Sequence, residues 1–330
     1  MKTFKNSELK TFEQLAMLTQ SSLKNVLASF LKKHYRKIVH TKDYLIAEGD
    51  IPVALTAHLD TAFDAPPSEI FFDSIKNVVW SPSGLGADDR AGVFAIVQII
   101  RSGLRPHIIF TTEEETGGIG ASKLSLLECP FKDLKYIIEL DRRGSNDCVF
   151  YDCDNKEFIE YVEQFGFEYN FGSYTDICEF CPTWEIAGVN LSIGYRDEHH
   201  ISEVLFVGQM YSTIEKVKNM LKEATNLKEP FKYVPSATGY RFTYGYDWYN
   251  NIEDSRYNVE RCYNCKKLFM EEELFPTVLQ DGNTALFCPD CLVEEVAWCE
   301  ECQNAYQKAS KNDPPAGLCP HCVAKQGENK

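Results

Sequence analysis

The chain has 330 residues, 44% of them hydrophobic and 25% charged, which allows one sizeable globular domain and a smaller one. Its formal net charge of −15 disfavours nucleic acid and anionic membranes as partners, because both require a basic surface. No apolar run approaches the roughly 18 residues that a membrane span requires, and the first residues lack the apolar core of a secretory signal. We therefore expect a cytoplasmic protein.

The pattern along the chain predicts one or two opening helices followed by alternating strands and helices. Apolar residues recur at helical spacing over residues 8–35, for example at Leu9, Phe12 and Leu15. Short β-rich runs lie at 43–47, 53–57, 107–111, 136–140 and 189–193. Helical patterns lie at 88–102, 117–127, 156–165 and 209–224. This alternation predicts a three-layer α/β/α sandwich with a mostly parallel central sheet.

The C-terminal part of the chain has a different composition. Residues 227–258 are rich in tyrosine, with scattered Pro, Gly and Asn and no clear period, which indicates a linker that docks on the main domain. Eight of the 13 cysteines follow it. The predicted organisation is a main domain at 1–226, an aromatic-rich linker at 227–258 and a cysteine-rich module at 259–330.

The cysteines of this module form four Cys-x-x-Cys pairs: Cys262/Cys265, Cys288/Cys291, Cys299/Cys302 and Cys319/Cys322. The spacing is typical of thiolate–metal ligation in a reducing compartment. Two pairs complete one tetrahedral site, so we expect two structural zinc ions in a zinc-ribbon-type module. Sequential and cross-braced pairing both fit. Acidic residues outnumber basic ones here, which favours a protein partner or self-association over nucleic acid.

Metal-binding side chains follow four of the predicted strands, and one more pair opens a predicted helix. They are His58 with Asp60, Glu113–Glu115, Asp141, His199 with His200, and Asp88 with Asp89. Ligands of open α/β sheets bind beyond the carboxyl ends of the strands, so these side chains are expected to converge. Imidazoles and carboxylates suit zinc, with manganese or cobalt as close substitutes. Two such ions ~3.5–4 Å apart activate water and polarise a carbonyl, and a glutamate of the 113–115 run is a candidate general base.

These motifs resemble those of the co-catalytic zinc exopeptidases, the superfamily of bacterial leucyl aminopeptidase, carboxypeptidase G and the TET aminopeptidases. The superfamily pattern is H-x-D, G-x-D-D-x-x-G, E-E-x-G, a single Asp or Glu, and a late His followed four residues on by Glu. In this chain the elements read His58-Leu59-Asp60, Gly86-Ala87-Asp88-Asp89-Arg90-Ala91-Gly92, Glu114-Glu115-Thr116-Gly117, Asp141, and His199 with Glu203. They occur in order within residues 45–225.

The resemblance implies a role for each matched position. The implied ligands are His58 and Asp141 for one zinc, Glu115 and His199 for the other, and Asp88 as the bridge between them. Glu114 would be the general base, which takes a proton from water and passes it to the leaving amine. Asp60 would accept a hydrogen bond from the imidazole of His58 and so fix its tautomer.

Several assignments stay open at this point. In the glutamate run, Glu113–Glu114 competes with the register chosen here. His199 is preferred over His200 only because of its spacing to Glu203. Asp147 and Asp152 are alternatives to the single aspartate ligand that follows the strand at 136–140.

Two further groups of residues allow more than one interpretation. Cys178 and Cys181 form a fifth Cys-x-x-Cys pair, which we interpret as two packed loop thiols rather than a metal or redox site. Arg142, Arg143 and Arg196 lie next to predicted ligands, where they could hold a substrate carboxylate or balance the nearby carboxylates.

The short spacings between motifs predict a compact catalytic domain, nearest the leucyl aminopeptidase branch. Only 57 residues separate Asp141 from His199, and only 29 separate His58 from Asp88, too few for the inserted domains of other branches. The expected function is metal-dependent hydrolysis of an amide bond at a peptide N-terminus. A deacylase of small N-acyl substrates would use the same constellation. An adaptor that acts through its zinc tail is the third hypothesis, and intact ligand positions count against it.

Overall fold

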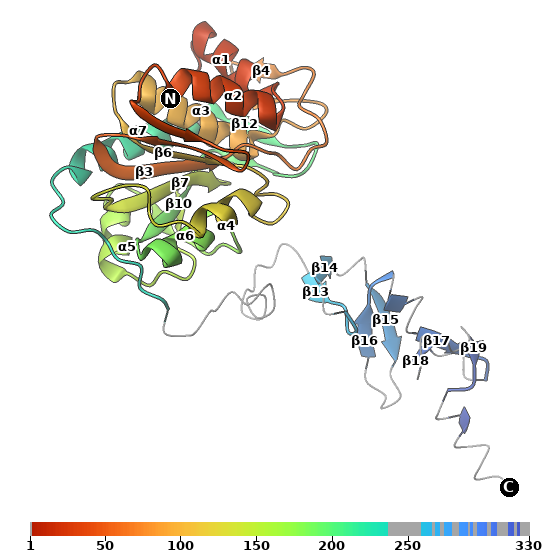
Figure 1. Ribbon diagram of the computed structural model, residues 1–330. Coiled ribbons are helices and arrows are strands. Elements are labelled where there is room, and N and C mark those ends of the chain that lie inside the picture. Colours follow the sequence, from red (N-terminus) through yellow and green to blue (C-terminus); the bar gives the residue numbers. More distant parts are fainter. Residues whose placement is uncertain are drawn as a thin grey trace. The chain divides into compact units, whose positions relative to one another are not determined.

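The computed structural model describes residues 2–236 and, further on, 259–265, 268–270, 274–278, 284–289, 291–292, 296–301, 305–308, 316–319 and 322–323. The chain divides into two compact units, Met1–Trp248 and Tyr249–Lys330. The first unit is an α/β domain (Figure 1). Within the described ranges, no helix combines the length and the apolar character needed to cross a membrane.

The first unit is built on an eight-stranded sheet. Its strands are β1 (Lys37–His40), β2 (Tyr44–Glu48), β3 (Ile51–His58), β6 (Pro106–Thr111), β7 (Tyr136–Arg142), β8 (Asp147–Val149), β9 (Glu168–Tyr169) and β10 (Gly188–Ser192). They are arranged in the order β1-β2-β6-β3-β7-β10-β8-β9, and the central strands β6, β3, β7 and β10 are parallel. The mostly parallel sheet is therefore confirmed, and each predicted strand lies within two residues of an observed one.

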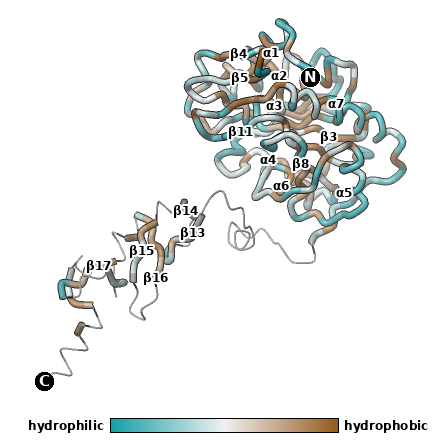
Figure 2. The backbone as a smooth tube through the Cα atoms, turned by 180° about the vertical axis from the view of Figure 1, so that it is seen from behind, coloured by the Kyte–Doolittle hydropathy of each residue, from teal (hydrophilic) through white to brown (hydrophobic). Residues whose placement is uncertain are grey.

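Helices cover both faces of this sheet, which gives the predicted three layers. The helices within residues 2–236 are α1 (Asn6–Ala16), α2 (Gln20–Leu31), α3 (Ala87–Arg101), α4 (Ile119–Ser125), α5 (Lys156–Glu163), α6 (Ile177–Trp184) and α7 (Val207–Ala224). Along β3, Val53 and Leu55 pack with residues of α1, α3 and α7, whereas Ala54 packs with α4 and α6. This alternation follows from the two-residue period of a strand. The hydrophobic stretches of the tube in Figure 2 accordingly run along the buried elements, including β3.

A second, antiparallel sheet was not predicted from the sequence. It contains β4 (Phe71–Asp73), β5 (Val78–Trp80), β11 (Tyr195–Arg196) and β12 (Val204–Phe206), in the order β11-β12-β5-β4. β11 and β12 flank the loop that carries His199, and β5 precedes the loop that leads to Asp88. This small sheet therefore anchors two segments that carry candidate ligands.

The first part of the predicted linker packs on the first unit as an extended strap, residues 231–236. Lys232 and Pro235 form isolated β-bridges with Ile186 and Cys153. The ring of Phe231 lies 5.0 Å from that of Phe158, within an aromatic cluster on the domain. Residues 237–258 of the predicted linker lie outside the described residues.

The described residues of the second unit form two two-stranded sheets and one three-stranded sheet, with cysteine-rich cores. Its strands are β13 (Val259–Arg261), β14 (Leu268–Met270), β15 (Phe275–Val278), β16 (Thr284–Phe287), β17 (Val296–Cys299), β18 (Ala305–Gln307) and β19 (Ala316–Gly317). One core contains Cys262, Cys288 and Cys291 with Phe287, and a second contains Cys299 with two further cysteines. Cores this small rarely hold a fold without a metal or disulfide.

Candidate metal centre

The predicted metal-binding side chains gather beyond the carboxyl ends of the central parallel strands. His58 is the last residue of β3, and Asp141 lies near the end of β7. The run Glu113–Glu115 follows β6, which lies beside β3 in the sheet. Parallel strands place their carboxyl ends at one edge, and this is how residues far apart in sequence come together.

A first cluster joins His58, Asp88 and Asp141. His58 Nε2 lies 2.9 Å from Asp88 Oδ1 and 3.6 Å from Asp141 Oδ1. The imidazole of His58 is fully buried, and its Nδ1 lies 3.3 Å from Asp60 Oδ1. The far ring nitrogen thus faces a carboxylate, the arrangement that orients a metal-binding imidazole.

A second cluster joins Asp88, Glu115 and His199. His199 Nε2 lies 3.0 Å from Glu115 Oε2 and 3.3 Å from Asp88 Oδ2. Asp88 therefore presents one oxygen to each cluster, because its Oδ1 faces His58. Within each cluster the candidate ligand atoms lie within 4.8 Å of one another.

The composition of the two clusters fits a pair of divalent cations. Three carboxylates and two imidazoles lie close together, and buried like charges are unfavourable without a cation between them. Glu115 Oε1 is buried and has no hydrogen-bond partner in the described structure, so it is available to a ligand. This donor set suits zinc, and manganese or cobalt as well.

Asp60 connects the first cluster to the glutamate run. Its Oδ1 accepts the backbone N–H of Glu114 at 3.1 Å, and its Oδ2 accepts that of Glu115 at 3.0 Å. Burial raises the pKa of the Glu114 carboxyl to about 9; His58 opposes the shift and Asp141 adds to it. Divalent cations nearby lower the pKa of a carboxyl, which a general base requires.

Close packing explains why the motif at the start of α3 contains a glycine at position 92. The N–H of Gly92 donates to Asp89 Oδ1 at 2.9 Å. A side chain at position 92 would overlap the carbonyl oxygen of Leu140 and the carboxylate of Asp89. Glycine therefore lets α3 approach β7 closely, and so brings Asp88 next to Asp141. The peptide bond between Asp88 and Asp89 is cis.

Several neighbours of Asp141 were not identified from the sequence. Tyr195 donates its hydroxyl to Asp141 Oδ1 at 3.0 Å, and Thr175 donates to Oδ2 at 3.2 Å. Two more carboxyl groups, Glu139 and Asp176, are fully buried in the same unit. Glu139 was detectable in principle, since a glutamate inside an apolar strand pattern is unusual. Tyr195, Thr175 and Asp176 carry no such signal.

The alternatives left open in the sequence do not join either cluster. His200 is exposed, and its Nδ1 lies 2.8 Å from the carbonyl oxygen of Glu198. Asp147 Oδ2 lies 3.9 Å from Arg142 Nε. The carboxylate of Asp152 accepts a hydrogen bond from the hydroxyl of Ser236 in the strap. None of these three belongs to a potential metal-binding group among the described residues.

The three arginines each have a partner within the first unit. Arg143 pairs with Glu198 at 2.9 Å. Arg142 donates to the carbonyl oxygen of Phe171 at 2.8 Å, and the guanidinium of Arg196 lies 5.1 Å from the ring centroid of Phe206. A role in holding a substrate carboxylate stays a prediction.

Cys178 and Cys181 lie on α6 rather than in the predicted loop, and Cys181 is buried whereas Cys178 is half-buried. Burial raises the pKa of both thiols well above the usual range. Thiols with a raised pKa stay neutral and react poorly, which supports a packing role.

In the second unit, sulfur atoms meet in two groups. Cys262, Cys265, Cys288 and Cys291 form the first, and Cys299, Cys319 and Cys322 form the second. Cys302, the predicted fourth ligand of the second group, lies outside the described residues. The two groups follow sequential pairing of the Cys-x-x-Cys motifs rather than cross-braced pairing.

Comparison with protein-family models and with curated proteins gave no match. Solved structures, however, match over most of their length. Aminopeptidase PepT from Bacillus cereus has 14% identity and a TM-score of 0.55, over 66% of this chain and 98% of that one. A tripeptidase from Staphylococcus aureus has 14% identity and a TM-score of 0.53, over 67% and 98%.

A TET aminopeptidase from a marine sediment Thaumarchaeota archaeon matches with 13% identity and a TM-score of 0.51, over 66% of this chain and 97% of that one. The chain has the fold of these aminopeptidases. The three-layer α/β/α fold with a mostly parallel central sheet, which the sequence predicted, is therefore shared with these solved structures. At such low identity the likeness defines the fold, and the function has to be argued from the site.

Proposed function

We propose that this chain is a hydrolase that uses two divalent cations, most simply zinc, to cleave an amide bond at the N-terminus of a peptide. The observation that carries the proposal is the position of Asp88. One of its oxygens faces His58 and the other faces His199, so a single carboxylate is shared by two potential metal sites. A shared carboxylate is the usual bridge of a two-metal hydrolytic site.

Each cation would have its own protein ligands besides the shared carboxylate. His58 and Asp141 would hold one ion, and Glu115 and His199 the other. When bound, two such ions polarise a carbonyl and lower the pKa of water. The protein positions these ligands through Asp60, Tyr195 and Thr175.

Glu114 is the proposed general base. Its backbone is held by Asp60, and its carboxyl is close enough to His58, Asp88 and Asp141 for their charges to act on it. In this position Glu114 would take a proton from the attacking water and return it to the leaving amine. Hydrolysis of an amide needs both transfers.

Cleavage at the N-terminus of a peptide is supported by the solved structures that share this fold. The solved structures named above are aminopeptidases and a tripeptidase. These names describe the activities of those proteins. We extend the proposal to this chain because all five candidate metal ligands are present in it. The proposed catalytic domain spans residues 1–226, with the strap docked on it.

The two cysteine groups of the second unit are proposed to hold one structural zinc each, in a module spanning residues 259–330. Zinc-bound thiolates and the five cysteines elsewhere suit a reducing compartment, and we propose a cytoplasmic protein. The excess of acidic residues in the module supports a protein partner or self-association.

The test compares wild-type protein with Glu114→Gln and with Glu113→Gln on a mixed peptide pool read by mass spectrometry. Glu113 is the matched control, because it is the neighbouring carboxyl of the same run. Wild type and Glu113→Gln should remove residues stepwise from free N-termini, whereas Glu114→Gln should keep its zinc and lose turnover.

Wild-type turnover by Glu114→Gln would remove the assigned role of that residue. N-terminally acetylated peptides separate the substrate classes in the same experiment. Equal cleavage of acetylated and free peptides would replace the aminopeptidase proposal with a deacylase. Intact peptides in every sample, with zinc present in the site, would contradict peptide hydrolysis.

A further inference from the structure

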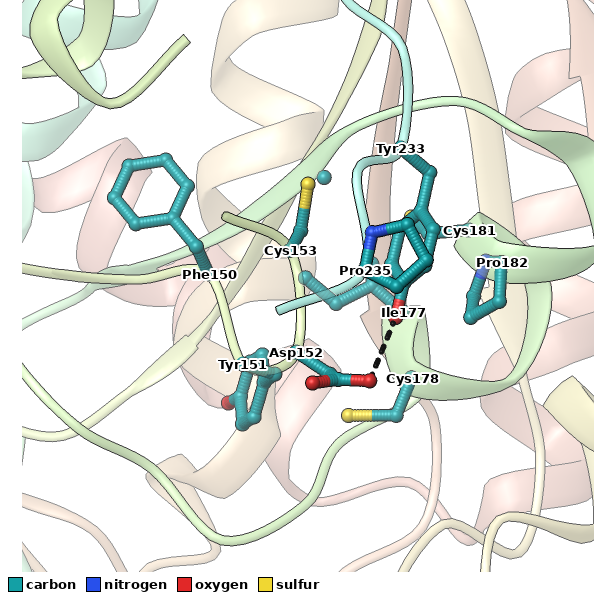
Figure 3. A pocket seen from close by; sticks show the side chains of 11 residues that line it. Phe150, Tyr151, Asp152, Cys153, Ile177, Cys178, Cys181, Pro182, Tyr233 and Pro235 are labelled. Atoms are coloured by element: carbon teal, nitrogen blue, oxygen red, sulfur yellow. Dashed lines mark hydrogen bonds between the residues drawn. The ribbon is translucent and has the colours of Figure 1, made fainter. Parts of the chain in front are cut away.

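A pocket of about 370 Å³ lies in the first unit between α6, the residues after β8, the start of β10 and the strap (Figure 3). Its volume is in the range of small-molecule sites. Its walls are formed by Phe150, Tyr151, Asp152, Cys153, Ile177, Cys178, Cys181, Pro182, Gly188, Tyr233 and Pro235. None of these residues belongs to the proposed metal centre or to its general base.

Tyr151 separates this pocket from the metal centre. Its ring lines the pocket, and its hydroxyl accepts a hydrogen bond of 3.0 Å from Asn190 Nδ2. The same nitrogen donates to the carbonyl oxygen of Asp141 at 2.8 Å. Two side chains, those of Tyr151 and Asn190, therefore connect the pocket to the candidate ligand Asp141, which does not itself line the pocket.

The lining is mostly apolar and contains soft, neutral thiols. Tyr151, Tyr233 and two prolines lie around the cavity (Figure 3). The ring of Phe150 turns away from it and packs on the rings of Phe158 and Tyr169. Burial raises the pKa of Cys153, Cys178 and Cys181, so these thiols stay protonated. They do not form a metal-binding group within the described residues, which disfavours a metal ion as the occupant.

Asp152 supplies the charge of this lining. Its carboxylate accepts hydrogen bonds from Ser236 Oγ at 2.6 Å and from Tyr233 Oη at 3.4 Å. Within residues 2–236 no salt bridge joins it to a basic side chain, and no basic residue lines the pocket. A carboxylate in a pocket that is also lined by two tyrosines attracts a cation and repels an anion.

We propose that this pocket binds a small amine with an apolar body. The body would fill the space between Tyr151, Tyr233 and the face of α6, and the ammonium group would pair with Asp152. Phosphates and carboxylates are disfavoured by the same charge. Neutral apolar molecules of equal size would bind more weakly, because they leave the carboxylate without a cation.

The test measures binding of three matched probes to the full chain by isothermal titration calorimetry. The probes are 2-phenylethylamine, 2-phenylethanol and 3-phenylpropionate, which carry a cationic, a neutral and an anionic end on a similar body. The amine should bind at least about tenfold more tightly than the alcohol, and the acid should not bind. Equal affinity for amine and alcohol, or no amine binding, would overturn the proposal.

Variants then locate the bound amine. Asp152→Asn should weaken amine binding about tenfold and leave alcohol binding unchanged. Ser236→Ala is the matched control, because it removes one hydrogen bond to Asp152 and keeps the charge. Cys178→Leu reduces the cavity without changing charge, and it should weaken both probes even if Asp152→Asn folds poorly.

The metal centre is the competing location, since it too is acidic. His199→Ala removes a candidate ligand there and should leave amine binding within twofold of wild type. Loss of binding in His199→Ala together with normal binding in Asp152→Asn would place the amine at the metal centre and overturn the proposal. Because these readouts are binding affinities, they are independent of whether peptides are cleaved.

Discussion

The carboxylate of Glu203 accepts the backbone N–H of Asp88 at 3.0 Å, and its second oxygen accepts that of Ala87 at 3.1 Å. Asp88 and Glu203 are 115 positions apart in the chain, and Glu203 is fully buried. The contact holds the first turn of α3 in place from the end of the loop that carries His199. It therefore fixes the shared carboxylate relative to the second cluster.

Glu203→Gln should weaken zinc binding at the metal centre about tenfold or more. The amide nitrogen of glutamine would face one of the two backbone N–H donors, which costs about 1–3 kcal/mol and displaces Asp88. Zinc affinity is measured by competition with a chelator. Glu198→Gln is the control, since Glu198 lies in the same loop and pairs with Arg143 at 2.9 Å. An equal loss in both variants would contradict a specific role for Glu203.

Asp88→Asn should lower the zinc content by two ions per chain, because both clusters lose a charged ligand. Glu115→Gln should lower it by only one, because Glu115 belongs to a single cluster. Native mass spectrometry counts the bound ions. Asp89→Asn serves as the neighbouring control and should keep all of them. A loss of one ion in Asp88→Asn would show that the two sites are independent.

The sequential arrangement of the cysteines predicts which double variants lose two zinc ions. Cys262→Ser combined with Cys291→Ser should lose one ion, because both sulfurs belong to the same group. Cys262→Ser combined with Cys319→Ser should lose two. The ion count of the second unit, taken from the native mass, distinguishes these results. Loss of two ions in the first combination would indicate cross-braced pairing.

His107 should make the first unit less stable as the pH falls below 6.5. Its side chain is buried, its Nδ1 accepts the N–H of Gly49 at 3.1 Å, and burial lowers its pKa to about 4. Between pH 4 and 6.5 the unfolded chain binds more protons than the folded one, so stability decreases as the pH falls. At pH 5 the loss is about 2 kcal/mol.

The comparison variant for this effect is His107→Asn, which keeps an oxygen acceptor for Gly49 and cannot become charged. Urea unfolding followed by circular dichroism at pH 7 and pH 5 gives the loss of stability for each protein. The loss should be smaller in the variant by about 2 kcal/mol. The same loss in both proteins would show that another group causes the pH dependence.

Much of the central fold was predictable because its strands are long enough to show a pattern. β3 and β7 have eight and seven residues, and each carries a candidate ligand at or next to its last residue. The order of motifs along the chain then indicated a common site at one edge of the sheet. Their convergence follows from parallel pairing, which the alternation of strands and helices already predicts.

Other parts depend on contacts that a linear pattern does not contain. The strands of the small sheet have two or three residues, too few for a visible alternation. Helix α6 contains Pro182 near its end, and its cysteines suggested a loop motif. The contact between Glu203 and the start of α3 arises only when the chain folds, since nothing near Asp88 in sequence points to it.

Asp60 binds no metal in the proposed scheme, yet it faces the ring of His58 and holds the backbone of both Glu114 and Glu115. A related chain could keep every ligand and still be inert if this one aspartate were replaced. A search that checks only for the metal ligands would then classify such a chain wrongly as an active enzyme. For distinguishing enzymes from inactive descendants of this fold, the residue two places after the first histidine is thus as informative as the ligands themselves.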